Sequence, residues 1–197
     1  DEHPGRNVTG THDMTPIAEQ VDLIQQILPD ATRIGTIYTS SEKNSQVQVD
    51  ILKQVCEAKG LAVVERTIST VNDIQQATQS IVTECDVLWL STDNNIASAM
   101  PQVASVTDEV GMVVVCGEEG MVASGGTLTY GIDYYELGYS AGQMAAQILK
   151  GEGTPAEMAI QGSSKYSLVV NQEAIDAIGL ELPEEIAKTA TFVNAGE

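Results

Sequence analysis

The hydrophobic positions along the chain alternate between a pattern typical of strands and a pattern typical of helices. Short, nearly continuous apolar runs predict strands that are covered on both faces. Between these runs, apolar residues recur every three or four positions, which predicts amphipathic helices. The predicted strands, of which the last two are short, cover 33–38, 61–64, 86–90, 112–116, 127–130 and 167–170.

Proline and glycine mark several ends of the predicted helices. Pro16 stands in the first turn of the first helix, where proline is tolerated, and Pro29 follows its end. Gly60 and Gly151 are expected to stop two later helices, because glycine readily adopts the conformation that ends a helix. The predicted helices begin near Pro16, Glu42, Thr70, Ile96 and Tyr134.

This alternation of strands and helices predicts an α/β fold. Strands joined by helical connections of this length form a doubly wound parallel sheet with helices on both faces. The strongest linker signals are the stretches 151–155 and 162–164, which are rich in glycine, serine and threonine.

Composition excludes several classes of partner. The 197 residues include 9 basic and 28 acidic side chains, a formal net charge of −19, which disfavours nucleic acid and anionic lipid. No apolar run approaches the length of a membrane-spanning helix. The chain starts without methionine or a signal peptide. We therefore expect it to begin partway through a longer protein, or to be a processed or cloned piece.

The cysteines and histidines do not form a recognisable reactive or metal-binding pattern. Cys56, Cys85 and Cys116 are widely spaced among apolar neighbours, and both histidines, His3 and His12, lie near the start. We expect the cysteines to be buried as small hydrophobic side chains, without a disulfide framework. We also expect no metal, no cofactor and no catalytic triad.

The candidate chemistry lies in the loops after the predicted strands, because ligands of such sheets bind outside the carboxyl ends of the strands. The first loop leads into a helix, whose free N–H groups and serine hydroxyls favour a small carboxylate. No phosphate-binding glycine pattern occurs. Helix capping by Ser41 or Asn44 is the alternative. The candidate residues of this loop are Ser40, Ser41, Glu42, Asn44 and Ser45.

Acidic residues follow three other predicted strands. Asp93 (beside Asn94), Glu118 and Asp133 are candidates for holding an ammonium group, with Tyr134 next to the last. Helix capping by the two aspartates and a solvated loop position for Glu118 are the alternatives. Combined with the anion pocket, these carboxylates suit a zwitterion such as an α-amino acid. An aromatic wall could come from Tyr38, Trp89, Tyr130, Tyr134 and Tyr135, with core packing as the alternative for Trp89.

Several stretches of these loops resemble the family of ABC-transporter substrate-binding proteins that includes tryptophan- and tyrosine-type receptors. The resemblance covers about Gly5 to Ala190, and Arg6 stands where the family usually has glycine. The stretches that carry it are 5–11, 34–45, 91–94, 117–122, 130–138 and 148–151.

The resemblance implies a two-lobed type I periplasmic-binding-protein fold that closes on an amino acid, and the likeness to tryptophan- and tyrosine-type receptors leads us to expect an aromatic one. It also implies an ABC permease as partner, no enzymatic activity, and a location outside the cytoplasm, either lipid-anchored or periplasmic. The resemblance implies a first lobe before Asp1, and we expect that lobe to be missing from this sequence. The implied divisions are a tail and first crossing (1–12), the second lobe (13–132), a crossing with a helix for the first lobe (133–162), and a return with the C-terminal tail (163–197).

The interpretation also predicts self-association of this chain. Without the first lobe, helix Tyr134–Lys150 should expose an apolar stripe through which two chains associate. The stripe consists of Leu137, Ala141, Met144, Ala145 and Ile148. The ligand-sensing domain of a transcription regulator has the same fold and is the main alternative; an enzyme with a doubly wound sheet is a third. The shared fold cannot discriminate among them.

Overall fold

The computed structural model describes residues 4–163 and 165–194. His3, Ser164 of the second linker signal and the last three residues of the predicted C-terminal tail lie outside the described residues. The chain divides into two compact units, and each is described by itself. Thr15–Gly131 and Ser167–Glu197 form what we call the sheet unit, and Asp1–Met14 with Ile132–Tyr166 form the helix unit.

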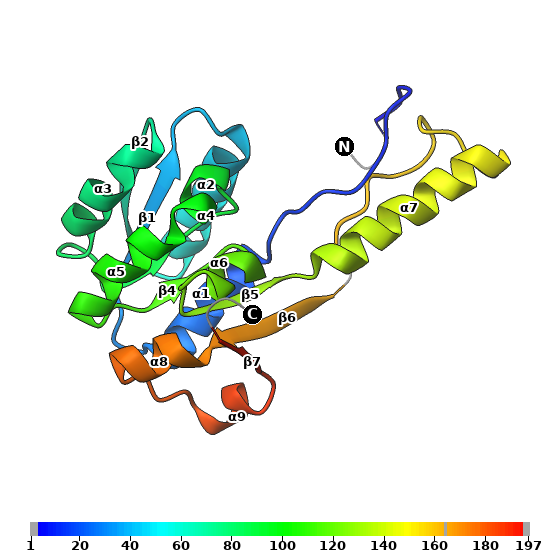
Figure 1. Cartoon of the computed structure of the whole chain (residues 1–197). Helices are drawn as coiled ribbons and strands as arrows, with labels where there is room; N and C mark the ends of the chain where they lie inside the picture. Colours follow the sequence, from blue (N-terminus) through cyan, green and yellow to red (C-terminus); the bar gives the residue numbers. More distant parts are fainter. Residues whose placement is uncertain (1–3, 164, 195–197) are drawn as a thin grey trace. The chain divides into compact units, whose positions relative to one another are not determined.

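A seven-stranded sheet organises the fold, with the strand order β2-β1-β3-β4-β5-β6-β7 (Figure 1). The pairs β1–β2, β1–β3, β3–β4, β4–β5 and β6–β7 are parallel. The predicted α/β class is confirmed. The strands are β1 Arg33–Thr39, β2 Ala62–Ile68, β3 Val87–Trp89, β4 Val114–Val115, β5 Leu128–Ile132, β6 Tyr166–Asn171 and β7 Thr191–Val193.

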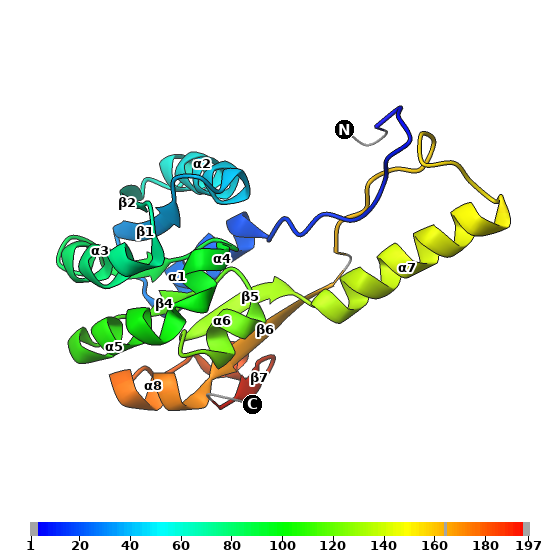
Figure 2. The same cartoon turned by 45° about the horizontal axis from the view of Figure 1, so that its top comes forward.

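Helices connect most of these strands (Figures 1 and 2). They are α1 Ile17–Ile27, α2 Lys43–Ala58, α3 Ile74–Ile81, α4 Asn94–Ser98, α5 Met100–Val110, α6 Glu119–Ala123, α7 Tyr134–Lys150, α8 Gln172–Ile178 and α9 Glu184–Ala187, with a short 3-10 turn, η1, at Val71–Asp73.

Strand β3 shows how the sheet is buried on both faces. Successive side chains of a strand point to opposite faces. Leu88 belongs to a hydrophobic cluster that also contains Ile74 and Ile81 of α3 and Met100 and Val103 of α5. Trp89 points the other way and donates its indole N–H to Gln20 of α1, at 2.8 Å. Trp89 is fully buried, so core packing, the alternative left open by the sequence, is its role.

The predicted helix starting near Ile96 is two helices. α4 ends at Ser98 and α5 starts at Met100, with Ala99 between them in a non-helical conformation. Pro101 lies in the first turn of α5. A proline at that position has no N–H to continue the preceding helix and its ring crowds the preceding turn, which explains the break.

Several short elements differ from the hydrophobic pattern in length or are not visible in it. Strand β4 is limited to Val114–Val115, although the apolar run is longer. The edge strand β7 consists of three residues that pair with β6. Helices α6 and α9 have five and four residues. These lengths are below the window in which a period can be recognised.

The three cysteines are free and buried. Burial raises the pKa of the Cys56 thiol to about 11, and it raises the pKa of Cys85 to about 11. Burial raises the pKa of Cys116 further. All three thiols are therefore protonated and unreactive near neutral pH, in agreement with their predicted role in packing.

The helix unit contains α7 and two segments joined by a parallel bridge between Thr11 and Gln161. The Ser140 hydroxyl of α7 donates to the Gln161 side chain at 2.8 Å. In the predicted apolar stripe, Leu137 and Met144 are 8% and 3% exposed, Ala141 and Ile148 are half-buried, and Ala145 is exposed. The expectation that the whole stripe is bare was therefore wrong for its two buried residues. The large hydrophobic side chains of α7 that are exposed are Tyr134, Tyr135, Tyr139 and Leu149.

Candidate functional site

The candidate site of the sheet unit lies where the neighbouring strands β1 and β3 end. Glu42 is the N-cap residue of α2, and Asp93 is the N-cap residue of α4. Because β1 and β3 are parallel neighbours, both helices begin at the same edge of the sheet. The loop after β1 and the loop after β3 are therefore adjacent, at the carboxyl ends of parallel strands, where the sequence placed the candidate chemistry.

Asp93 joins these two loops through its carboxylate. Its Oδ2 accepts the Thr39 N–H at 2.7 Å, and its Oδ1 accepts the Thr39 hydroxyl at 2.9 Å. Oδ1 also accepts the N–H groups of Asn95 and Ile96, both at 3.1 Å, which is helix capping. Asp93 is 0% exposed. Direct contact with a ligand ammonium stays a prediction, but in this structure the chain itself encloses the carboxylate.

A second connection between the same loops runs through Thr92. The Gln48 side-chain amide of α2 donates to the Thr92 hydroxyl at 2.6 Å, and the Thr92 N–H donates to Gln48 Oε1 at 3.2 Å. Asn44 donates its side-chain N–H to the Thr92 carbonyl at 2.9 Å. The first turns of α2 therefore hold the end of the loop after β3.

Glu42 and Asn94 form the outermost connection. Glu42 Oε2 accepts both the backbone N–H and the side-chain amide of Asn94, at 3.2 and 3.3 Å. The buried Ser45 hydroxyl lies 3.5 Å from the same oxygen. Ser40 and Ser41 are exposed beside this contact. Neither Ser41 nor Asn44 caps α2 through its side chain, so the capping alternative for this loop is not what the structure shows.

Glu118 lies after β4, at the start of α6. Its two carboxylate oxygens accept the N–H groups of Gly120 and Met121, at 2.6 and 2.9 Å. Glu118 is therefore a capping residue, whereas the sequence offered a solvated loop position as the alternative to ligand binding. The preceding Gly117 packs against the backbone of Ser91 and Thr92. A Cβ atom at position 117 would lie only 2.7 Å from the Ser91 carbonyl carbon and the Thr92 nitrogen.

Asp133 and Tyr134 belong to the helix unit. Asp133 Oδ1 accepts the N–H groups of Tyr135 and Glu136 at 2.9 and 3.2 Å and thereby caps α7. The Tyr134 hydroxyl donates to Asp13 at 3.2 Å. The structure thus brings the candidates from Ser40 to Glu118 to one edge of the sheet unit. Asp133 and Tyr134 belong to the helix unit.

Several residues that connect the two loops by hydrogen bonds were not among the candidates predicted from the sequence. Thr39, Gln48, Thr92 and Asn95 all take part in the hydrogen bonds between the two loops. Gln48 carried a usable signal, because it is a polar residue on the buried face of α2 together with Val49 and Leu52. A buried polar side chain needs a hydrogen-bond partner.

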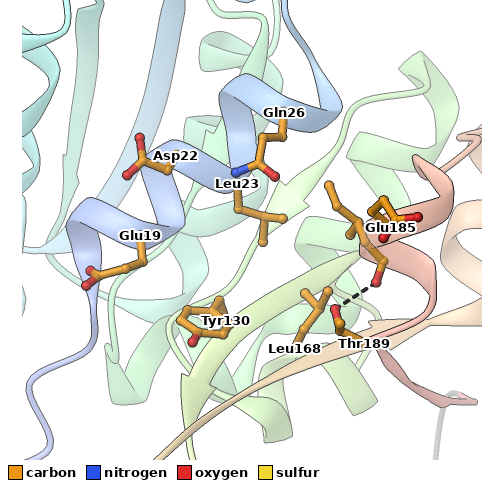
Figure 3. A pocket seen from close by; sticks show the side chains of 9 residues that line it. Glu19, Asp22, Leu23, Gln26, Tyr130, Leu168, Glu185 and Thr189 are labelled. Carbon is orange, nitrogen blue, oxygen red and sulfur yellow. Dashed lines mark hydrogen bonds between the residues drawn. The ribbon is translucent and has the colours of Figure 1, made fainter.

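A separate cavity of about 360 Å³ opens on the sheet unit, away from the candidate loops (Figure 3). Leu23 of α1, Tyr130 of β5 and Leu168 of β6 form its apolar floor. Glu19 and Asp22 line its rim and are directed away from Leu168 (Figure 3). The other lining residues are Gln26, Glu185, Ile186 and Thr189, so none of the candidate loop residues contributes to this cavity.

The described residues offer neither a metal-binding cluster nor a membrane-spanning helix. Within 4–163 and 165–194, no three His, Cys, Asp or Glu side chains are grouped so that they could hold a metal ion. No helix in the same part of the chain is long and apolar enough to cross a membrane.

Comparison with known proteins identifies the family. The sequence profile described as "ABC transporter substrate binding protein" matches residues 1–194. The chain belongs to this family of ABC transporter substrate-binding proteins. Its members are binding proteins rather than enzymes, so the enzyme alternative is excluded, and the resemblance recognised in the sequence is confirmed.

Two relatives are particularly similar. A tyrosine-binding protein of Clostridioides difficile strain R20291 is 37% identical over 180 residues, which cover 91% of this chain and 52% of the relative. A Streptococcus pneumoniae structure, the ABC domain in complex with L-Trp, is 34% identical with a TM-score of 0.88, covering 98% of this chain and 66% of that one. The chain spans about half the length of the curated relatives it matches.

Transcription regulators of the LacI family share the fold. The structure of one from Arthrobacter sp. FB24, complexed with lactose, is 17% identical with a TM-score of 0.64 and covers 86% of this chain and 67% of that one. This likeness concerns the fold alone.

Proposed function

We propose that the protein containing this chain binds an aromatic L-amino acid, tyrosine or tryptophan, and delivers it to an ABC permease. The observation that carries the proposal is the 37% identity to a tyrosine-binding protein across 91% of this chain. The L-Trp complex of the pneumococcal relative supports the same class of ligand. Delivery to a permease implies a location outside the cytoplasm, with a lipid anchor or in a periplasm.

The candidate edge of the sheet unit suits the two charges of an amino acid. The exposed hydroxyls of Ser40 and Ser41 precede α2, a helix of 16 residues whose N-terminus favours a carboxylate. Acidic side chains in the same loops favour the ammonium group. Glu118 is a further candidate in the sheet unit, and Asp133 and Tyr134 are candidates in the helix unit.

Isothermal calorimetry on the complete gene product that contains this sequence tests the proposal. We expect binding heat with L-tyrosine or L-tryptophan and much weaker heat with aliphatic amino acids, without any chemical change in the ligand. Failure to bind any amino acid, together with tight binding of a sugar, would contradict the proposed ligand class.

We also propose that the 197-residue chain by itself associates through α7. The exposed residues Tyr135, Tyr139, Gly142, Ala146 and Leu149 recur at intervals of four and three, which places them on one face of the helix. An antiparallel pair centred on Gly142 puts Tyr139 opposite Ala146 and Tyr135 opposite Leu149. Large side chains then face small or flexible ones along a two-fold contact.

A further inference from the structure

The two acidic side chains in the adjacent loops of the sheet unit have opposite surroundings. Asp93 is 0% exposed and accepts four hydrogen bonds from Thr39, Asn95 and Ile96. Three of these bonds end on Oδ1 and one on Oδ2. Because Asp93 is fully buried, its carboxylate has no exposed surface that could receive a ligand group in this structure.

The side chain of Glu42, in contrast, is partly exposed. Asn94 donates two hydrogen bonds to Oε2, at 3.2 and 3.3 Å, and the Ser45 hydroxyl lies 3.5 Å from the same oxygen. Within 4–163 and 165–194, no donor to Oε1 and no ion pair of Glu42 is found. One oxygen is thus fixed by the protein while the other remains available as an acceptor.

We infer that Glu42 receives the ammonium group of the ligand and that Asn94 is a positioning residue that orients the Glu42 carboxylate. This inference rests on the proposed function, in which the ligand is an amino acid. An oriented carboxylate binds an ammonium group more favourably than a mobile one, because less side-chain freedom is lost on binding. Ser40 and Ser41, which are proposed to bind the ligand carboxylate, directly precede Glu42 in the chain. Neighbouring residues would therefore bind the carboxylate and the ammonium group of the amino acid.

Asp93 supports this arrangement from the interior. It is bonded to Thr39, three residues before Glu42, and to Asn95, directly after Asn94. One buried side chain therefore fixes the segments on both sides of the Glu42–Asn94 contact. This division of roles replaces the simpler expectation that Asp93 itself contacts the ligand.

The test compares a ligand with and without its ammonium group, using the complete gene product. The probes are L-tyrosine and 3-(4-hydroxyphenyl)propionate or, if tryptophan binds more tightly, L-tryptophan and 3-indolepropionate. Glu42→Gln should weaken binding of the amino acid at least about tenfold and change binding of the deaminated analogue less than about twofold. The matched control is Glu57→Gln, near the other end of α2, which should leave both affinities unchanged.

Asn94→Ala provides the readout for positioning. It should weaken binding of the amino acid in the wild-type background and cause no additional loss in the Glu42→Gln background, because both changes act through the same carboxylate. An additional loss there would overturn the role of Asn94. If Glu42→Gln does not fold, Glu42→Asp keeps the charge, and its loss of affinity should again be confined to the amino acid.

The outcomes separate the inference from the proposed function. Equal losses for the amino acid and its analogue in Glu42→Gln, or no loss for either, would overturn the inference while leaving the proposed function intact. A wild-type protein that binds no amino acid would contradict the proposed function and the inference with it.

Discussion

The indole N–H of Trp89 donates to the side-chain oxygen of Gln20 at 2.8 Å, and both residues are 0% exposed. The Gln20 amide also donates to the Tyr130 carbonyl at 2.9 Å. One buried glutamine of α1 thus connects β3 with β5. The polar atoms of this contact have no access to water, so the fold depends on their mutual hydrogen bonds.

Gln20→Leu should destabilise the sheet unit by about 1–3 kcal/mol, because it leaves the buried Trp89 N–H without its acceptor. Urea unfolding followed by the fluorescence of Trp89, the one tryptophan of the chain, measures the change. Gln26→Leu, on an exposed position of the same helix, is the control and should shift stability by no more than about 0.5 kcal/mol. Equal midpoints for the two variants would contradict the role assigned to Gln20.

Asp93→Ala should cost about 3 kcal/mol or more, because a buried charged acceptor and a helix cap are lost together. The free energy of unfolding from urea titration is the measurement. Glu109→Ala, at an exposed position on α5, is the control. A loss below about 1 kcal/mol would show that Asp93 does not hold the two loops together.

Asp86 should make stability depend on acidity. Hydrogen bonds from the backbone N–H groups of Thr32 and Arg33 and from the Arg33 guanidinium lower the pKa of Asp86 to about 2. Its ordinary pKa in an unfolded chain is about 3.9. The folded state therefore binds this proton less readily, and the stabilisation is complete above the unfolded pKa.

That stabilisation should be lost as the pH falls from about 4 to about 2. Asp86→Asn should be less stable than the wild type by about 1 kcal/mol above pH ~5, since solvent screening reduces the effect at this partly exposed position. The difference should vanish near pH ~2. Urea titrations over this range measure it, and a difference that is independent of pH would rule out the carboxylate charge as its source.

Tyr139 is the sensitive position for association of the 197-residue chain. Tyr139 is 58% exposed in the centre of the exposed face of α7. Tyr139→Glu should raise the dissociation constant of the dimer at least about tenfold, because it places like charges near the two-fold contact. Sedimentation at micromolar concentrations measures the equilibrium.

Gln147→Glu adds the same charge at an exposed position on another side of α7 and should leave association unchanged. A wild-type chain that stays monomeric at every concentration would refute the contact.

The sequence by itself determined the features that depend on local order. The alternation of apolar runs and amphipathic segments gave the α/β class, and Pro16 and Gly151 marked where helices begin and end. The loops at the carboxyl ends of β1 and β3 followed from that topology, so most of the candidate site could be located in advance. These signals are visible because they arise from neighbours within about one helical turn or one strand.

Only the tertiary structure decided which side chains at the candidate edge face inward. Asp93 and Glu42 are both acidic loop residues in the sequence. Asp93 is enclosed through hydrogen bonds with Thr39, which lies far away in the sequence but on the neighbouring strand β1, whereas Glu42 is partly exposed. Likewise, the apolar stripe of α7 is partly covered, and its tyrosines are exposed. Burial and hydrogen-bond partners depend on residues that are far apart in the chain. The local pattern of apolar and polar residues along the sequence contains no information about these contacts.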